Sequence, residues 1–563
     1  MSEESLSSTQ YLTSGQVSFT GLGSGTDFES IIEKTIEVES YRIKRLEAWK
    51  SQWDAKVVGF QALNTNMLSL KTTLEGMNTP DEFLIKTSSS SDSTVLTATA
   101  DSSAQVVPHT VIINQLAQNE IFIGQHAFAD TSAVINNSGG DALFDYTYAG
   151  ESVSVTVPDG TTLAGLINMI NNDPDNPGVK AGYVKVSDSD YRLQIWGMDL
   201  GTDNQFSVDG STTLSNASAA DFAETQNAQN CQLRIDGFPS AAGGYIERAT
   251  NTVSDAITGL TLSLKDTGTV NIATNVDNEA IKESVRTFVG QVNELRTLII
   301  NLTDFNDTTQ EGSLLTGNYG VQIISTKLKS LTATKGIGFD YDEDTFTSLG
   351  ILGITTDADA GSATLGLLEF DEELFDDALE YDPDGVAAIF SAYYAGTSDS
   401  TSLSYQSHIQ GTTEAGEYEV AYTMDGAGNI TAATINGHTA SIDNGTKEIT
   451  GAAGNPEAGL AIKVQDLTAG DHTGTVRIKL GKAAEMVESL KDLTSSTDGP
   501  LKILEDNYQD IMDSIDEKID YEERRLERME RDLRNKYARL EALLGQYDNL
   551  QSSMNSQIAQ LED

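Results

Sequence analysis

Apolar residues recur at steps of three and four along the N-terminal part of the chain. The repeat runs from Thr26 to Met77 with no proline before Pro80, and this spacing places the apolar side chains on one face of an α-helix. Glu29 follows Thr26 by three residues, which predicts a capping box at the helix start. Because about fifty residues exceed an ordinary globular helix, the pattern predicts a coiled-coil partner. The stripe consists of Phe28, Ile31, Ile32, Ile36, Ile43, Leu46, Trp49, Trp53, Val57, Phe60, Leu63, Met67, Leu70, Leu74 and Met77.

A matching stripe lies near the other end of the chain, between Leu501 and Leu561. Its steps also alternate between three and four, with occasional slips of the kind that coiled coils show as stutters. Within it, the run Tyr521–Leu540 interleaves arginine and lysine with acidic residues. A basic run can bind nucleic acid, but this alternation predicts a solvated, ion-paired helix face. The stripe consists of Leu504, Tyr508, Ile511, Ile515, Ile519, Leu526, Met529, Leu533, Tyr537, Leu540, Leu544, Tyr547, Met554, Ile558 and Leu561.

A third amphipathic helix is predicted from Asn278 onward. Its apolar residues step by four and three in turn up to Leu302, which predicts a buried seam in a helical bundle. The three helices can bury their stripes against one another although the chain separates them widely. A stripe that outlasts its partner within the chain leaves apolar surface for other chains. The seam consists of Ile281, Val285, Phe288, Val292, Leu295, Ile299 and Leu302.

Between these helices the pattern changes to short strands. Asp236-Gly237 lies between two such runs and fits a tight hairpin turn. Thr161 or Thr162 is expected to cap a short helix that interrupts the strands. Alternating or β-branched runs predict strands at Val95–Ala100, Val111–Ile113, Ser152–Val157 and Gly182–Val186.

A separate β module is predicted from Gly396 to Gly481, where the composition shifts to Gly, Thr, Ala and Ser. Asn436-Gly437 fits a hairpin turn inside it. The module is expected to be inserted between helical parts of the chain. Its predicted strands are Gly416–Met424, Ile430–Ile435, Leu460–Val464 and Gly474–Leu480.

Composition narrows the classes of protein that remain. The 563 residues include 35 basic and 85 acidic side chains, a formal net charge of −50 at pH 7. This length predicts about three to five globular pieces. The acidic excess argues against nucleic-acid binding and against docking to an anionic membrane. No apolar run is long enough to insert into a bilayer, and the N-terminus shows neither a basic n-region nor an apolar h-region.

Candidate chemistry is sparse. Cys231 is the only cysteine, so an intramolecular disulfide and a cysteine-based zinc cluster are excluded, and it is expected to be a small core residue. The histidines show no metal-binding spacing, and no nucleotide or nucleophile motif is present. Asp340–Asp344 begins like a calcium loop, but Thr345 and Ile351 stand where glycine and glutamate are needed, which predicts a solvated acidic turn. The sequence therefore predicts no catalytic residue, no metal and no cofactor.

Several stretches together resemble the flagellar filament cap family, hook-associated protein 2 (FliD). The segment Phe19–Asp27, with the letters FTGLGSGTD before a long helix, resembles the N-terminus of that family. Gly150–Ser207 is similar to the flagellin hook IN motif. Further similar stretches follow in family order and leave Gly396–Gly481 without a counterpart in shorter members. These stretches are Leu233–Gly237, Thr250–Val253, Gly259–Leu264, Phe288–Leu295, Gly336–Phe339, Leu367–Leu379, Asp382–Phe390 and Arg531–Leu550.

The resemblance implies a structural function. Family members form a ring, about a pentamer, on the growing filament tip, where they help exported flagellin fold into place and prevent its leakage. The implied partners are further copies of the chain, flagellin, hook–filament junction proteins and a flagellar export chaperone at the C-terminal helix. The implied location is extracellular, at the flagellum tip, after export by the flagellar type III apparatus without a cleavable signal peptide.

The expected fold is α+β multidomain, with N- and C-terminal helices forming a coiled-coil or helical-bundle leg and β-rich head domains between them. The leg helices are expected to supply the oligomer and filament interface through Ile43, Leu46, Trp49, Trp53, Phe60, Leu526, Met529, Leu533, Leu540 and Leu544. The expected parts are a flexible segment 1–26, a coiled-coil helix 27–78, a head domain 79–125 with 231–277, a second head domain 126–230, a helical part of the leg 278–395, the inserted module 396–481 and C-terminal helices 482–563.

Two other functions are compatible with the residues alone. An adhesin would bind host or surface glycans through the β-rich head, with Gly396–Gly481 as the place to look. An enzyme such as a polysaccharide hydrolase would need paired carboxylates, which are abundant in so acidic a chain but cannot be singled out.

Overall fold

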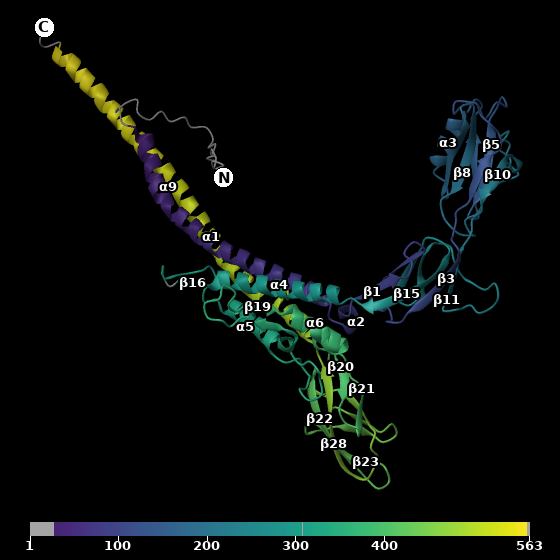
Figure 1. The fold of residues 1–563 in the computed structure, drawn as a ribbon. Coiled ribbons are helices and arrows are strands. Elements are labelled where there is room, and N and C mark those ends of the chain that lie inside the picture. Colours follow the sequence, from purple (N-terminus) through teal and green to yellow (C-terminus); the bar gives the residue numbers. More distant parts are fainter. Residues whose placement is uncertain (1–26, 307, 560–563) are drawn as a thin grey trace.

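The computed structural model describes residues 27–306 and 308–559, and its longest elements are two helices that lie side by side (Figure 1). Helix α1 spans Phe28–Glu75 and helix α9 spans Pro500–Ala559. We call this antiparallel pair the leg. With many sheets between the two helices, the predicted α+β multidomain class is confirmed. The predicted segment 1–26 and Leu561 lie outside the described residues.

The start of α1 differs from the prediction. The N-cap is Asp27, whose Oδ1 accepts a hydrogen bond from the Ser30 N–H at 3.0 Å. The predicted capping box is therefore wrong, and a single N-cap at Asp27 takes its place, because a carboxylate satisfies a free N–H group and complements the positive end of the helix dipole. Thr26 itself lies outside the described residues. The helix ends at Glu75, and Pro80 opens the short helix α2, Pro80–Phe83.

Shorter helices surround the lower half of the leg and form what we call the helical body. Helix α4, Asn278–Thr303, packs against α1 and buries the predicted seam from Ile281 to Ile299, which confirms the third amphipathic helix. Phe288 lies in the shared core, in edge contact with Phe390. The other elements of the body are α5 Tyr319–Ala333, α6 Glu372–Tyr381, α7 Pro383–Ser391, α8 Lys482–Leu493, β16 Phe305–Asn306, β17 Glu311–Gly312, β18 Ile354–Thr356 and β19 Leu368–Phe370.

An inner β unit follows the leg end that carries α2 (Figure 1). Its two sheets have the strand orders β1-β15-β3-β11-β12 and β13-β14-β2. Cys231 is fully buried between them, as predicted for a small core residue. Asp236 and Gly237 both adopt positive φ and form the predicted tight hairpin turn, since Ile235 and Phe238 on either side of it exchange two backbone hydrogen bonds; a longer loop then leads to β12. The strands are β1 Lys86–Ser90, β2 Leu96–Ala100, β3 His109–Gln115, β11 Cys231–Ile235, β12 Ile246–Arg248, β13 Thr252–Ile257, β14 Leu260–Leu264 and β15 Gly268–Val276.

An outer β unit lies beyond the inner one (Figure 1). Its sheets have the orders β10-β4-β8-β7 and β6-β5-β9, and their core includes Phe144, Tyr146 and Tyr148. Thr162 caps helix α3, since its Oγ1 accepts from the Gly165 N–H at 3.1 Å. The elements are β4 Ile121–Gly124, β5 Ala142–Tyr148, β6 Glu151–Val157, α3 Leu163–Asn171, β7 Val179–Ser187, β8 Asp190–Gly197, β9 Phe206–Val208 and β10 Phe222–Gln226.

A third β unit projects from the helical body in a separate direction (Figure 1), and we call its strands β20 to β28 the inserted module. Its sheets have the orders β20-β28-β22-β23-β24 and β21-β27-β26-β25, with a common apolar core. Asn436-Gly437 joins β23 to β24 as the predicted hairpin turn, with positive φ at both residues. The strands are β20 Ala395–Ser398, β21 Leu403–Ser407, β22 Gly416–Met424, β23 Ile430–Ile435, β24 His438–Thr439, β25 Ser441–Asp443, β26 Glu448–Thr450, β27 Ala461–Val464 and β28 Gly470–Lys479.

Candidate functional site

The leg is joined to the helical body by an aromatic cluster around Tyr508. The Tyr508 ring lies edge-on to Trp53, with centroids 4.9 Å apart, and stacks on Phe60 at 5.3 Å. Its hydroxyl accepts a hydrogen bond from Asn318 Nδ2 at 3.0 Å. The Oδ1 atom of the same Asn318 caps α5 by accepting from the Val321 N–H. The cluster therefore ties α1, α9 and α5 together at one point.

The residues predicted for the interface occupy different environments. Phe60 is only 1% exposed and belongs to the core of its own chain, and Leu526 is also buried. Trp49 and Leu540 are exposed. Trp53 lies in the cluster around Tyr508, and the remaining predicted residues are half-buried along the leg, namely Ile43, Leu46, Met529, Leu533 and Leu544.

Ion pairs cross from α1 to α9 above this cluster. Arg534 Nη2 lies 2.6 Å from Glu29 Oε1, and the Glu29 hydrogen bond is the main cause that raises the pKa of Arg534. Further along, Arg42 lies 3.2 Å from Glu522. The run Tyr521–Leu540 is therefore ion-paired as predicted. The other cross-helix pairs are Arg525 with Glu39 at 2.7 Å and Lys50 with Asp516 at 2.6 Å.

Helix α9 extends beyond the start of α1 at the far end of the leg. The first residue of α1, Phe28, stacks on Tyr537 of α9 at 4.9 Å, and α9 then continues to Ala559. We call residues 538–559 the overhang; a helix of this length measures about 33 Å. Its exposed apolar side chains step by three and four residues and so follow one helix face. They are Leu540, Leu543, Tyr547, Leu550, Met554 and Ile558, and Tyr547 is 70% exposed.

The overhang contains interface candidates that lie outside the predicted set. Leu543 and Leu550 were absent from the predicted stripe, and Tyr547, Met554 and Ile558 were placed in the stripe but not in the interface. The signal that could have found them is the spacing of three and four residues that continues from Leu540 to Ile558.

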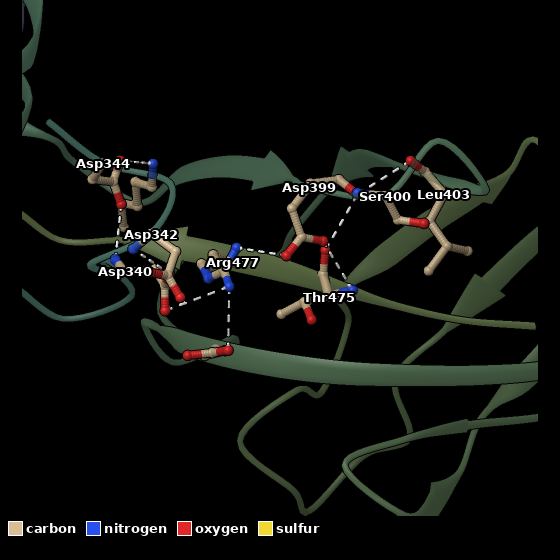
Figure 2. A network of polar contacts seen from close by, with 11 residues as sticks. Asp340, Asp342, Asp344, Asp399, Ser400, Leu403, Thr475 and Arg477 are labelled. Atoms are coloured by element: carbon tan, nitrogen blue, oxygen red, sulfur yellow. Dashed lines mark hydrogen bonds and ion pairs between the residues drawn. The ribbon is translucent and has the colours of Figure 1, made fainter.

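A polar network joins the inserted module to the helical body (Figure 2). Arg477 of β28 lies 2.9 Å from Asp399 and 3.7 Å from Asp340, and the Asp340–Asp344 turn belongs to the helical body. Asp344 Oδ1 accepts from Lys479 Nζ at 2.5 Å. The prediction of a solvated acidic turn is therefore wrong for these carboxylates, because basic side chains from a distant part of the chain neutralise them.

Across residues 27–306 and 308–559, no three histidine, cysteine, aspartate or glutamate side chains gather so that they could hold a metal ion. Within the same ranges, no helix combines the length and the apolar character needed to cross a bilayer.

A long two-helix leg, β units at its end, and exposed apolar side chains along the overhang together define a structural assembly protein. The profile described as the C-terminus of flagellar hook-associated protein 2 matches residues 228–549, and the profile of its N-terminus matches residues 24–120. The chain belongs to the flagellar hook-associated protein 2 (FliD) family, as the sequence resemblance predicted. This family is structural, which agrees with the prediction that the chain is not an enzyme.

Individual relatives agree with this assignment. The A-type flagellar hook-associated protein 2 of Pseudomonas aeruginosa is 28% identical over 399 residues, which cover 66% of this chain and 80% of that protein. The flagellar hook-associated protein 2 of Escherichia coli (strain K12) is 26% identical over 395 residues, with the same coverage of 66% and 80%. The relatives give no support to the adhesin alternative.

The fold also resembles a solved structure. The crystal structure of the flagellar cap protein FliD D1-D2-D3 domains from Escherichia coli superposes with a TM-score of 0.50 at 21% identity, and the match covers 80% of this chain and 99% of that one. At this identity the likeness concerns the fold.

Proposed function

We propose that this chain is the structural cap at the distal tip of the bacterial flagellar filament, where it promotes ordered polymerisation of exported flagellin and prevents its leakage. The observation that carries the proposal is the overhang. Six apolar side chains lie exposed along one helix face, and burying a leucine, isoleucine or methionine side chain completely contributes up to about 1.5–3 kcal/mol. A surface of this kind favours association with other helices.

The proposed assembly is a homo-oligomeric ring, about a pentamer. The predicted leg residues divide into two roles within it. Those buried in the chain, such as Phe60 and Leu526, stabilise the packing of the leg within one copy. Those exposed, such as Trp49 on α1 and Leu540 in the overhang, contact neighbouring copies or flagellin. The other exposed apolar side chains of the overhang take part in the same contacts.

Further partners follow from the same proposal. The hook–filament junction proteins would precede the cap during assembly, and a flagellar export chaperone would cover the C-terminal helix before export. The protein would leave the cell through the flagellar type III apparatus and act outside it, at the flagellum tip. No cofactor enters this function.

A triple variant of the overhang tests the proposal. Leu543→Asp, Tyr547→Asp and Leu550→Asp place three charges on the apolar face, whereas Asn549→Asp, Ser552→Asp and Ser556→Asp place the same charges on the opposite face. Each variant is expressed in a strain that lacks the native protein. We expect the first variant to lose self-association in analytical ultracentrifugation and to release monomeric flagellin into the medium, while the second retains both functions. Filaments of native length with the first variant would refute the proposal.

A further inference from the structure

The inserted module meets the helical body at a junction that the chain crosses twice. Helix α7 leads through Ala392 into β20, and β28 leads through Leu480 into α8. A unit attached by two such short crossings can still change its direction, because relative motion between the domains of one chain is expected unless their interface is large and hydrophobic. The contacts at the crossings therefore decide whether the module has a fixed direction.

Arg477 is the centre of these contacts. Its side chain is 7% exposed and faces three carboxylates, two from the module and one from the helical body. Within the module it pairs with Asp399 at 2.9 Å and Glu417 at 3.3 Å, and across the junction with Asp340 at 3.7 Å. The Thr475 N–H donates to Asp399 at 3.2 Å and so holds that carboxylate toward the guanidinium (Figure 2).

The acidic turn of the helical body is preorganised to receive this arginine. The Asp342 N–H donates to Asp340 Oδ1 at 3.0 Å, and the Asp340 N–H donates to Asp344 Oδ2 at 2.8 Å. The backbone hydrogen bond from Asp342, with the positive charge of Arg477 as a smaller cause, lowers the pKa of Asp340. Backbone N–H groups of the turn thus hold both carboxylates in place. Each carboxylate keeps a second oxygen that faces a basic side chain of the module.

A second basic residue, two positions further along β28 and on the same face of the strand, makes a similar contact. Lys479 donates to Asp344 Oδ1 at 2.5 Å, and its ammonium lies 5.4 Å from the centre of the Phe339 ring. Residues 477 and 479 point to the same side of β28 because side chains alternate along a strand. The two cations of one strand therefore meet two carboxylates of one turn.

The backbone brings the two parts into close contact at the same place. The Leu480 N–H donates to the Ile337 carbonyl at 2.9 Å in an isolated β-bridge. Gly338 has φ of +77°, and a Cβ there would lie 2.3 Å from the Ile478 carbonyl oxygen. On another element of the body, Glu488 of α8 accepts a hydrogen bond from Tyr394 of the module boundary at 3.0 Å.

We propose that Arg477 and Lys479, paired with Asp340 and Asp344, form an ionic clasp that fixes the direction of the inserted module relative to the leg. The module is then a rigid arm of the helical body. Arg477 is buried and the other three charged groups of the clasp are half-buried. A different direction of the module would leave the buried guanidinium without its partner in the helical body, and this cost favours one arrangement. In a closed ring, symmetry would repeat the same arm direction at each copy.

Spin labels at two exposed positions test the clasp in the full-length chain. Thr326→Cys lies on α5 of the body and Ala432→Cys on β23 of the module, and both native residues are exposed. The native Cys231 is 0% exposed and does not compete for the label. Pulsed electron spin resonance then measures the distribution of distances between the body and the module.

The test variant is Asp340→Asn with Asp344→Asn, which keeps the side-chain shape and removes the charges on the body side only. The matched control is Glu417→Gln, which removes a carboxylate that Arg477 meets inside the module. We expect the distance distribution to widen at least twofold in the double variant and to keep its native width in the control. A native-width distribution in the double variant, or equal widening in the control, would overturn the clasp. The measurement uses the isolated chain, so its result is independent of filament capping.

Discussion

Replacing Tyr508 by alanine removes one of the contacts that fix the leg to the helical body. The ring contacts Trp53 and Phe60, and the hydroxyl accepts a hydrogen bond from Asn318, the residue that caps α5. Tyr508→Phe is the matched control, because it keeps the ring and removes only the hydrogen-bonded hydroxyl.

The magnitude follows from these contacts. Two aromatic pairs are each worth about 0.5–1.5 kcal/mol beyond the area they bury, and truncation of a fully buried aromatic residue to alanine costs about 3–5 kcal/mol. Tyr508 is half-buried, so we expect the alanine variant to lose about 3 kcal/mol of local stability, at the lower end of that range. The phenylalanine variant should lose about 1 kcal/mol, the net value of one hydrogen bond.

Hydrogen exchange measured by mass spectrometry resolves this difference. The gap of about 2 kcal/mol between the variants corresponds to roughly thirtyfold faster exchange in the alanine variant, for amides of α9 near residue 508 and of α5. Peptides of β22 in the inserted module serve as the internal reference and should not change. Equal exchange in the two variants, or equal acceleration in β22, would refute the role assigned to Tyr508.

Two further predictions concern the junction of the inserted module. Gly338→Ala should destabilise the chain by more than about 3 kcal/mol, since it combines a left-handed backbone with a clash against Ile478. The control is Gly428→Ala, where φ is also left-handed but no atom lies near the added Cβ, so it should cost about 1 kcal/mol. Calorimetry compares the stability of the two variants. Burial, aided by the hydrogen bond to Glu488, raises the pKa of Tyr394 from 10.0 to about 12. The folded chain therefore holds this proton more tightly than the unfolded chain, so the stabilising contribution is complete below pH 10, decreases as the pH rises and is lost above about 12. Denaturant titrations of the native chain and Tyr394→Phe should differ in slope against pH in that window, and parallel curves would contradict the assignment.

Local patterns in the sequence predicted the elements whose neighbours lie close along the chain. Strands β22 and β23 match their predicted bounds, and Thr162 caps α3 as expected, because alternation and capping are properties of a few consecutive residues. The ionic clasp could not be predicted in this way. Asp340 and Arg477 are far apart in sequence, and an acidic turn has the same local pattern whether water or a distant arginine faces it.

The overhang results from the register in which α1 and α9 pair. The lengths of the two predicted apolar stripes do not determine this register. The two predicted stripes have similar lengths. The first part of α1 packs against α9, whereas the second part of α1 also packs against α4 and α8. The pairing extends from Gln61, whose Nε2 donates to Glu505 at 2.8 Å, to Phe28 on Tyr537. Tyr508 at one end and the Arg534–Glu29 ion pair at the other hold this register. Because α1 is confined to that span, residues 538–559 can bury their apolar face only against something other than α1.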